Sequence, residues 1–303
     1  MNKSFASPLA QMLILIVCIL GSVIAVWCAA TFLTPAFGIT SSEFLYGSPT
    51  FNPTLTRYHL AVQSIALFLL PTLIASRVIT SKPLVYLGLK RKPLSINVFN
   101  SIFLMLFSMP FISYAAEANA QIPLPEWATN MEKSASELTA KILLTNSTGG
   151  FIANLFTVAL LPALSEELFF RGFLQNLARR LLKNPHVAIF TTAFIFSAFH
   201  LQFSGFIPRL LLGVGLGYLY HWSGSLWLPT AAHFTNNAAI CVYYFYISVK
   251  NTPINAQDIE AAMQGGAMVA LLSLMLVVIT LRRIFTTEKM HKRIQRLRRL
   301  TKL

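Results

Sequence analysis

The sequence predicts an all-α, polytopic membrane protein in which about eight transmembrane helices enclose an intramembrane polar cavity. Three observations predict this class: the composition, the spacing of uncharged windows and the distribution of basic residues. Of the 303 residues, 55% are hydrophobic and 11% are charged, and the mean hydropathy is +0.62. A soluble domain carries about 25% charged residues, so the shortage of charge indicates that lipid surrounds most of the chain.

Seven windows without Asp, Glu, Lys or Arg supply the predicted helices. Each is close to or above the roughly 20 apolar residues that a helix needs to cross the hydrocarbon core. The window 210–249 is long enough for two passes and contains Ser-Gly-Ser at 223–225, where a turn is expected. The windows are 4–42, 58–76, 93–116, 142–165, 184–208, 210–249 and 261–281.

The basic residues predict the orientation. Lys3 precedes the first helix, a basic cluster runs from Arg77 to Lys92, and another follows the fourth helix from Arg171 to Lys183. The loop 117–141 is acidic by contrast. Because basic loops stay in the cytoplasm, both termini are expected to be cytoplasmic, and the membrane is expected to be a bacterial inner membrane.

Residues 1–281 are predicted to form a single transmembrane domain, followed by a basic cytoplasmic tail, 282–303. The tail carries nine Lys or Arg and one Glu. Directly after a membrane helix, such a segment is typical of an anchor to anionic lipid headgroups, so lipid is an expected partner and nucleic acid is not. The first apolar segment is expected to be retained and not cleaved as a signal peptide. In the loop 119–147, apolar residues recur at helical spacing and predict an amphipathic surface helix.

Three charges interrupt the fourth helix, in the stretch LSEELFFRGFL at 164–174. Glu167 and Arg171 are four residues apart, so they lie on one helix face and can form an ion pair. Glu166 points about 100° away from Glu167 and is expected to face an interior cavity. Since each charge in hydrocarbon costs about 2.5–3.5 kcal/mol on insertion scales, the group is either a functional site or a buried network that fixes helix packing.

Two histidines and an asparagine strengthen the case for a site. His200 ends the stretch FSAFH at 196–200, and His233 precedes Asn237 by four residues in TAAHFTNN. A single histidine in an apolar helix is more often a packing residue, but two of them with an amide and an unpaired carboxylate favour function. One difficulty is depth, because the window 184–208 places His200 nearer the opposite membrane face from Glu166 unless this helix is tilted or short.

These motifs together resemble the CPBP (CAAX protease and bacteriocin-processing) family of intramembrane proteases, which includes the Rce1-type CAAX prenyl endopeptidases. The family's EExxxR, FxxxH and HxxxN motifs read here as Glu166 to Arg171, Phe196 to His200 and His233 to Asn237, in the family's order. The eight-helix layout also matches. The resemblance implies an endopeptidase that hydrolyses peptide bonds of membrane-associated or lipidated proteins, prenylated ones among them.

The resemblance also implies roles for the residues. Glu166 is the base that activates water, and His200 shares that task. His233 and Asn237 hydrogen-bond to the developing oxyanion. Glu167 and Arg171 form the shell that orients them. Glu166, His200 and His233 could ligate zinc, and family members are often labelled metalloproteases. However, the sequence contains no HExxH, so we expect a reaction without metal or other cofactor.

Two other functions stay open at this point. A non-catalytic membrane binding protein or a bacteriocin-immunity protein could keep the fold, although every motif position is retained here. A small transporter or channel would use the same polar residues as an ion path. It predicts broken helices or repeats in corresponding halves of the chain, which the sequence does not show.

Overall fold

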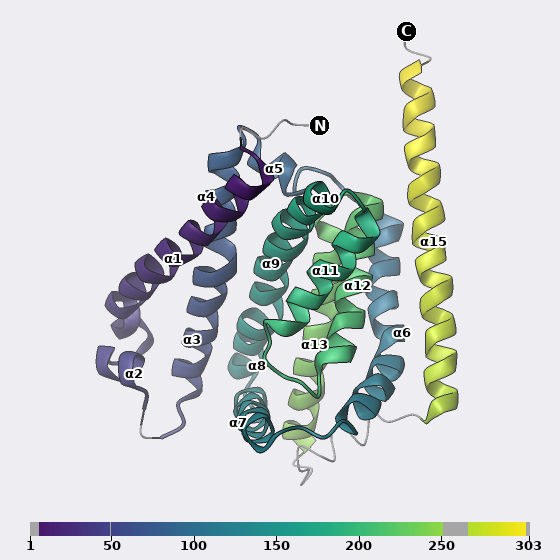
Figure 1. Cartoon of the computed structure of the whole chain (residues 1–303). Helices are drawn as coiled ribbons and strands as arrows, with labels where there is room; N and C mark the ends of the chain where they lie inside the picture. The colour runs from purple at the N-terminus through teal and green to yellow at the C-terminus, as the bar shows by residue number, and fades with distance from the viewer. Residues whose placement is uncertain (1–5, 49, 251–265, 301–303) are drawn as a thin grey trace.

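The computed structural model describes residues 6–48, 50–250 and 266–300. Within these ranges the regular structure is entirely helical, which confirms the all-α class. The helices stand side by side, and the beginning of α1 lies at the same end of the bundle as the end of α15 (Figure 1). Lys3 and the last three residues of the predicted tail lie outside the described residues.

Eight helical segments follow the predicted windows. The described chain turns between α12 and α13 at Gly224, which has a positive φ of 68°, where the sequence predicts a break. In chain order the segments are α1 (Pro8–Leu33); α3, η2 and α4 (Pro53–Ser64, Ile65–Leu69, Leu70–Ile79); α6 (Ser95–Ala120); α8, η3, α9, η4 and α10 (Thr148–Asn154, Leu155–Leu160, Leu161–Glu167, Leu168–Gln175, Asn176–Leu182); α11 (Pro185–Ala198); α12 (Phe206–Ser223); α13 (Trp227–Lys250); and α15 (Ala267–Leu300).

Five of these segments are long and apolar enough to cross a membrane. They are α1, the α3–α4 segment, α6, the α8–α10 segment and α15. Helix α11 is apolar but has only 14 residues. The protein is therefore a multi-pass membrane protein, and the number of eight passes stays a prediction.

Two of the long segments contain a π-helical stretch directly before a Leu-Pro pair. The stretch η2 precedes Pro71, and η3 precedes Pro162. Because proline has no N–H, the carbonyl four residues before it loses its usual helical donor. For Pro162 that carbonyl belongs to Val158, and the side-chain amide of Asn237 donates to it at 3.4 Å. The proline thus provides an attachment point for α13 on η3.

Helices α11 and α12 approach closely through two glycines. A Cβ on Gly213 would lie 3.0 Å from the Ala193 Cβ, and one on Gly217 would lie 2.8 Å from a methyl carbon of Ile189. Gly215, on the other face, has nothing within 4 Å. Small residues allow such close contact between membrane helices, and the contact leaves the carbonyls of both glycines reachable from η4.

The amphipathic helix predicted between the third and fourth passes is present as α7 (Glu126–Leu143). Ile142 and Leu143 are buried, as the apolar pattern predicts, whereas Met131 and Leu138 are exposed. The carboxylate of Glu132 accepts hydrogen bonds from the backbone N–H of Phe203 and of Ser204. Helix α7 therefore holds the loop that joins α11 to α12, instead of burying its whole apolar stripe.

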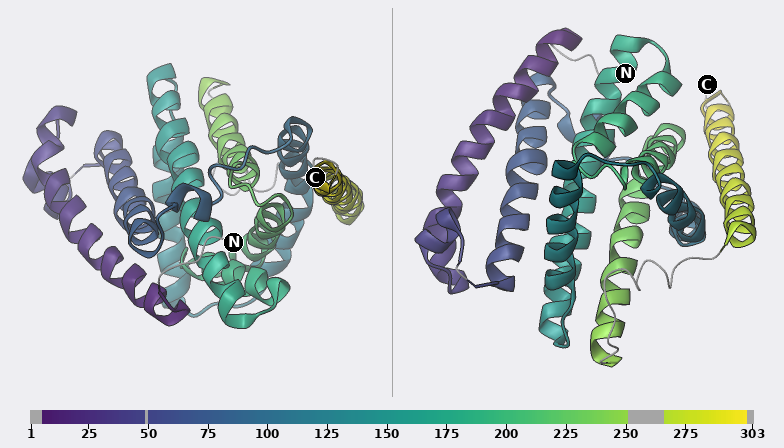
Figure 2. Two further views of the ribbon diagram at one scale, coloured as in Figure 1. Left: turned by 90° about the horizontal axis from the view of Figure 1, so that it is seen from above. Right: turned by 60° about the horizontal axis from the view of Figure 1, so that its bottom comes forward.

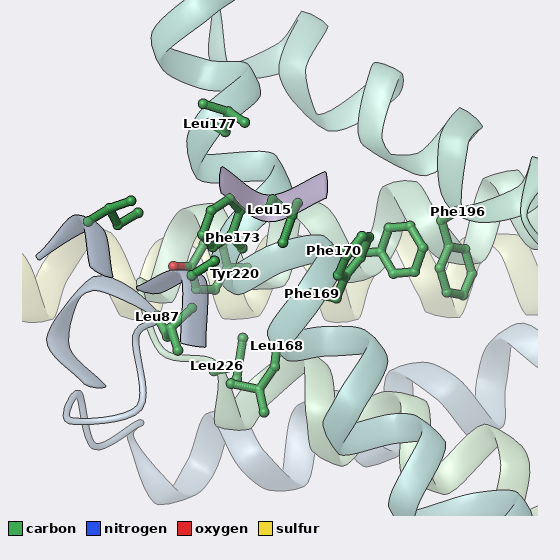
Figure 3. Packing of buried hydrophobic residues seen from close by; sticks show 12 residues of the cluster. Leu15, Leu87, Leu168, Phe169, Phe170, Phe173, Leu177, Phe196, Tyr220 and Leu226 are labelled. Atoms are coloured by element: carbon green, nitrogen blue, oxygen red, sulfur yellow. The ribbon is translucent and has the colours of Figure 1, made fainter. Parts of the chain in front are cut away.

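A different helix forms each of the two edges of the bundle. Helix α1 forms one edge and α15, packed against α6, forms the other (Figure 2). Helix α15 runs without a break across the boundary predicted at 281, so the division into a domain and a tail stays a prediction. The shorter elements η1 (Thr34–Phe37), α2 (Ser41–Tyr46) and α5 (Pro83–Tyr86) connect the first three long segments. The aromatic part of the central core lies between these edges, where Phe170 and Phe196 pack edge to face (Figure 3).

Candidate active site

A buried ion network occupies the centre of the bundle, at the junction of α9 and η4. Arg171 donates from Nη1 to Glu167 Oε1 at 2.8 Å, as the spacing of the two residues predicts, and both side chains are buried. His233 of α13 bonds through Nδ1 to the same carboxylate oxygen at 2.9 Å. Since that oxygen is an acceptor for both partners, Nδ1 carries the proton. The network therefore fixes the orientation of the His233 ring and joins α9 to α13.

Arg171 is held by a third element as well. Its Nη2 donates to the carbonyl of Gly213 at 3.1 Å, and one turn further along, Gln175 donates to the carbonyl of Gly217 at 3.0 Å. The guanidinium also lies over the Phe196 ring, 4.7 Å from its centroid. A buried charge is tolerated only when it is paired and hydrogen-bonded. The carbonyls of Gly213 and Gly217 on α12 thus accept from η4, and larger residues at these two positions would keep the carbonyls out of reach.

Glu166 lies on the other side of the same helix turn and is held far less firmly. Oε2 of Glu166 and Oε2 of Glu167 are both buried without a hydrogen-bond partner among the described residues. The difference is that Glu167 Oε1 accepts two hydrogen bonds, whereas the Glu166 carboxylate accepts none, and His233 Nε2 is 3.9 Å from its Oε2. A buried carboxylate oxygen without a partner is rare in folded proteins. A water molecule or a substrate proton would satisfy it. The two glutamates therefore have the different surroundings that their angular separation predicts.

His200 reaches this cluster through an aromatic ring and not through a hydrogen bond to Glu166. Phe196 packs edge-on against His200, with ring centroids 5.0 Å apart, and against His233, at 5.9 Å. The His200 Nδ1 bonds to the Phe196 carbonyl at 2.9 Å. As the neutral ring, with Nδ1 as the donor, His200 keeps Nε2 free to accept a proton.

The depth of His200 follows from the length of α11. The helix ends at Ala198, ten residues before the end of the predicted window, and Leu201 adopts a left-handed φ of 52°. At 1.5 Å per residue, 14 residues advance about 21 Å. The helix is thus shorter than predicted, and His200 lies two residues beyond its end, against the Phe196 ring that also packs on His233.

Asn237 lies one helical turn beyond His233, on the same side of α13, and among the described residues its amide donates only to the Val158 carbonyl, at 3.4 Å. This distance is at the long end for a hydrogen bond. Its side-chain oxygen accepts from Asn236 at 3.2 Å. The structure therefore brings Glu166, Glu167, Arg171 and His233 together, places His200 next to them across Phe196, and leaves Asn237 at the margin.

Arg209 is a neighbour of the site that the sequence analysis did not select. It is the only charged residue between positions 184 and 249, and it lies close enough to Glu166 and His200 to interact electrostatically with both. Hydrogen bonds to Gln202 hold its guanidinium. The signal was present, because a lone charge inside an apolar stretch is functional by default.

Among the described residues, no three His, Cys, Asp or Glu side chains gather as a ligand set. The expectation of a metal-independent reaction stays a prediction.

The fold and this cluster define a helical membrane protein with a charged site buried between its helices. Residues 148–239, from α8 into α13, match the family described as type II CAAX prenyl endopeptidase Rce1-like, which confirms the resemblance for this part of the chain. The uncharacterized protein YpbD of Bacillus subtilis (strain 168) is 33% identical over 91 residues, which are 29% of this chain and 43% of the relative. The chain thus aligns with less than half of that relative. No solved structure matches.

Proposed function

We propose that the protein is an intramembrane endopeptidase in which Glu166 activates the attacking water. The observation that carries the proposal is the carboxylate of Glu166, which accepts no hydrogen bond within the described chain and has His233 Nε2 3.9 Å from its buried Oε2. A general base must lie within hydrogen-bonding reach of the water that it deprotonates. Glu166 has this freedom, whereas Glu167 already accepts from Arg171 and His233.

In this mechanism the other polar groups act on the water and on the oxyanion. His200, with an acceptor nitrogen, shares the proton taken from the water. His233 donates from Nε2 only when its ring carries both protons, because Nδ1 is committed to Glu167. The ring that carries both protons stabilises an oxyanion on its Nε2 side. Asn237 turns its amide from the long bond to Val158 toward the same oxyanion.

The match with the prenyl endopeptidase family supports peptides at a membrane as the class of substrate. We propose that membrane-associated or lipidated proteins, including prenylated ones, are cleaved. We also place the protein in a bacterial inner membrane with both termini in the cytoplasm. The orientation is supported by the first and last helices, whose outer ends lie at the same end of the bundle (Figure 1).

The test uses the purified full chain in detergent and a quenched peptide library that includes farnesylated CAAX peptides. We expect wild-type protein to cleave library members, Glu166→Gln to lose cleavage, and cleavage to survive a chelator. Glu137→Gln, the same change on the exposed face of α7, is the matched control and should cleave like wild type. Equal cleavage by folded Glu166→Gln would refute the proposal. Cleavage abolished by the chelator and restored by zinc would show that the metal prediction is wrong.

A further inference from the structure

A second concave region lies outside the peptidase site, at the end of the bundle where α5, α10, α11 and α12 meet. It is a pocket of about 400 Å³. Its walls carry Arg91, Arg179, Arg180 and His221, and none of its lining residues is an aspartate or glutamate. Pockets of roughly 300–1,000 Å³ are the size that holds small molecules. The side chains that line this pocket therefore carry positive charge, with no acidic side chain among them to balance it.

The pocket is built from fixed groups. Arg180 donates to the Tyr86 hydroxyl at 2.8 Å and also bonds to Gln11 of α1. Asn176 donates to the Tyr220 hydroxyl at 2.7 Å and to the Tyr86 carbonyl at 3.2 Å. These bonds tie α1, α5, α10 and α12 together. The rim of the pocket is thus rigid, as a specific binding site requires.

Two of the pocket's arginines have guanidinium groups that are available to a ligand. Arg179 is exposed on α10, and the side chain of Arg91 lies against the backbone of Gly224, where its Nη1 would be 2.8 Å from an added Cβ. Within the described part of the chain, neither guanidinium has a hydrogen bond or ion pair to another side chain. Planar guanidinium groups pair with phosphate through two parallel hydrogen bonds. Two such groups at one pocket favour an anion with several oxygens.

The position of the pocket indicates where the anion comes from. The pocket lies at the end of the bundle that carries the basic loop 77–92 and the basic end of α10. Tyr218 and Trp222 pack against each other on α12 beside it, at 5.2 Å between ring centroids. Tyrosine and tryptophan concentrate at the membrane–water boundary. The pocket is therefore at the depth of lipid headgroups.

We propose that this pocket binds the phosphate group of an anionic phospholipid, through Arg91 and Arg179. The site is separate from the cluster around Glu166, because none of the residues that line the pocket belongs to that cluster. It does not depend on the proposed peptidase activity. General attraction between basic segments and anionic lipid is the competing explanation, and it predicts no preference for the pocket over the exposed arginines of α15.

The experiment is native mass spectrometry of the purified full chain in detergent, titrated with phosphatidylglycerol or phosphatidylcholine. We expect the first phosphatidylglycerol to bind at least about tenfold more tightly than phosphatidylcholine, and Arg91→Gln/Arg179→Gln to weaken it about tenfold. The matched control is Arg283→Gln/Arg293→Gln, which removes two exposed arginines of α15 and should change binding less than about twofold. Equal affinity for the two lipids, or equal weakening by the two double variants, would overturn the proposal.

Two further arms complete the test. If the glutamine variant does not fold, Arg91→Lys/Arg179→Lys replaces it. This variant keeps the charge but loses the paired donors, and it should bind phosphatidylglycerol about threefold more weakly than wild type. Unchanged binding would contradict a pocket that recognises phosphate through the guanidinium groups. Inorganic phosphate should not displace the lipid at equal concentration. Displacement would show that the site takes soluble phosphate and would overturn the proposal of a lipid ligand.

Discussion

The two sides of the α9–η4 junction differ in how completely their polar groups are paired. On the Glu167 side, one carboxylate oxygen accepts from Arg171 and from His233, and Arg171 reaches the Gly213 carbonyl. The second oxygen of Glu167 is buried without a partner, as is Oε2 of Glu166, but on the Glu166 side the carboxylate accepts no hydrogen bond from the described chain at either oxygen. Two adjacent glutamates in one helix thus differ in their hydrogen bonding. The paired side holds helices together, and the unpaired side has capacity left for chemistry.

The largest expected effect on the paired side follows from removing its cation. Arg171→Leu leaves the Glu167 charge buried without its main partner, and breaking a buried pair typically costs about 3–5 kcal/mol. The measurement is the apparent free energy of unfolding in detergent. Arg180→Leu, at the bundle end, should cost less, because its partners are neutral. A loss below about 1 kcal/mol for Arg171→Leu would show that the network does not hold the helices.

A second prediction sharpens the comparison on the side of catalysis. Asn237→Leu removes the amide that we assign to the oxyanion, and loss of one such donor lowers turnover by about 10²–10³-fold. Its neighbour Asn236 offers the same amide one position away, so Asn236→Leu is the control and should retain most activity. Turnover of the library peptides measures both. Equal effects of the two changes would remove Asn237 from the site.

A smaller effect is expected where α12 supports the network. Gly217→Ala places a methyl 2.8 Å from Ile189, and overpacking of this kind costs about 1–3 kcal/mol. Gly215→Ala meets nothing within 4 Å and should leave the unfolding free energy nearly unchanged or slightly higher. Thermal unfolding of the two variants in the same detergent compares them directly. If both variants are as stable as wild type, the close approach of α11 and α12 is not required.

Much of this arrangement could be predicted from the sequence. Local spacing gave the helical class, the turn near Gly224 and the Glu167–Arg171 pair, because each depends on residues a few positions apart. The different surroundings of the two glutamates also followed from the angle between neighbouring helix positions. The amphipathic helix was predicted, but only Ile142 and Leu143 of its apolar stripe are buried. The bond of Glu132 to a loop about 70 residues away in sequence could not be predicted from local spacing.

The remaining features depend on contacts between distant segments. The length of α11 is set where Ser197 donates to the Phe206 carbonyl at 2.7 Å and Leu201 turns left-handed, which an uninterrupted apolar window does not reveal. The acceptors of Arg171 and Gln175 are glycine carbonyls 42 residues further along the chain. Phe196 is the first residue of the FxxxH motif, and its position between His200 and His233 emerges only when α11 meets α13.

The most direct test of the account changes each of the two adjacent glutamates to glutamine and measures both turnover and stability. We predict that Glu166→Gln lowers turnover by about 10²–10⁴-fold while the unfolding free energy stays within about 1 kcal/mol of wild type. Glu167→Gln should instead destabilise the protein by about 3–5 kcal/mol, because Arg171 loses its charged partner. Full turnover in folded Glu166→Gln, or unchanged stability in Glu167→Gln, would contradict the division of roles between the two residues.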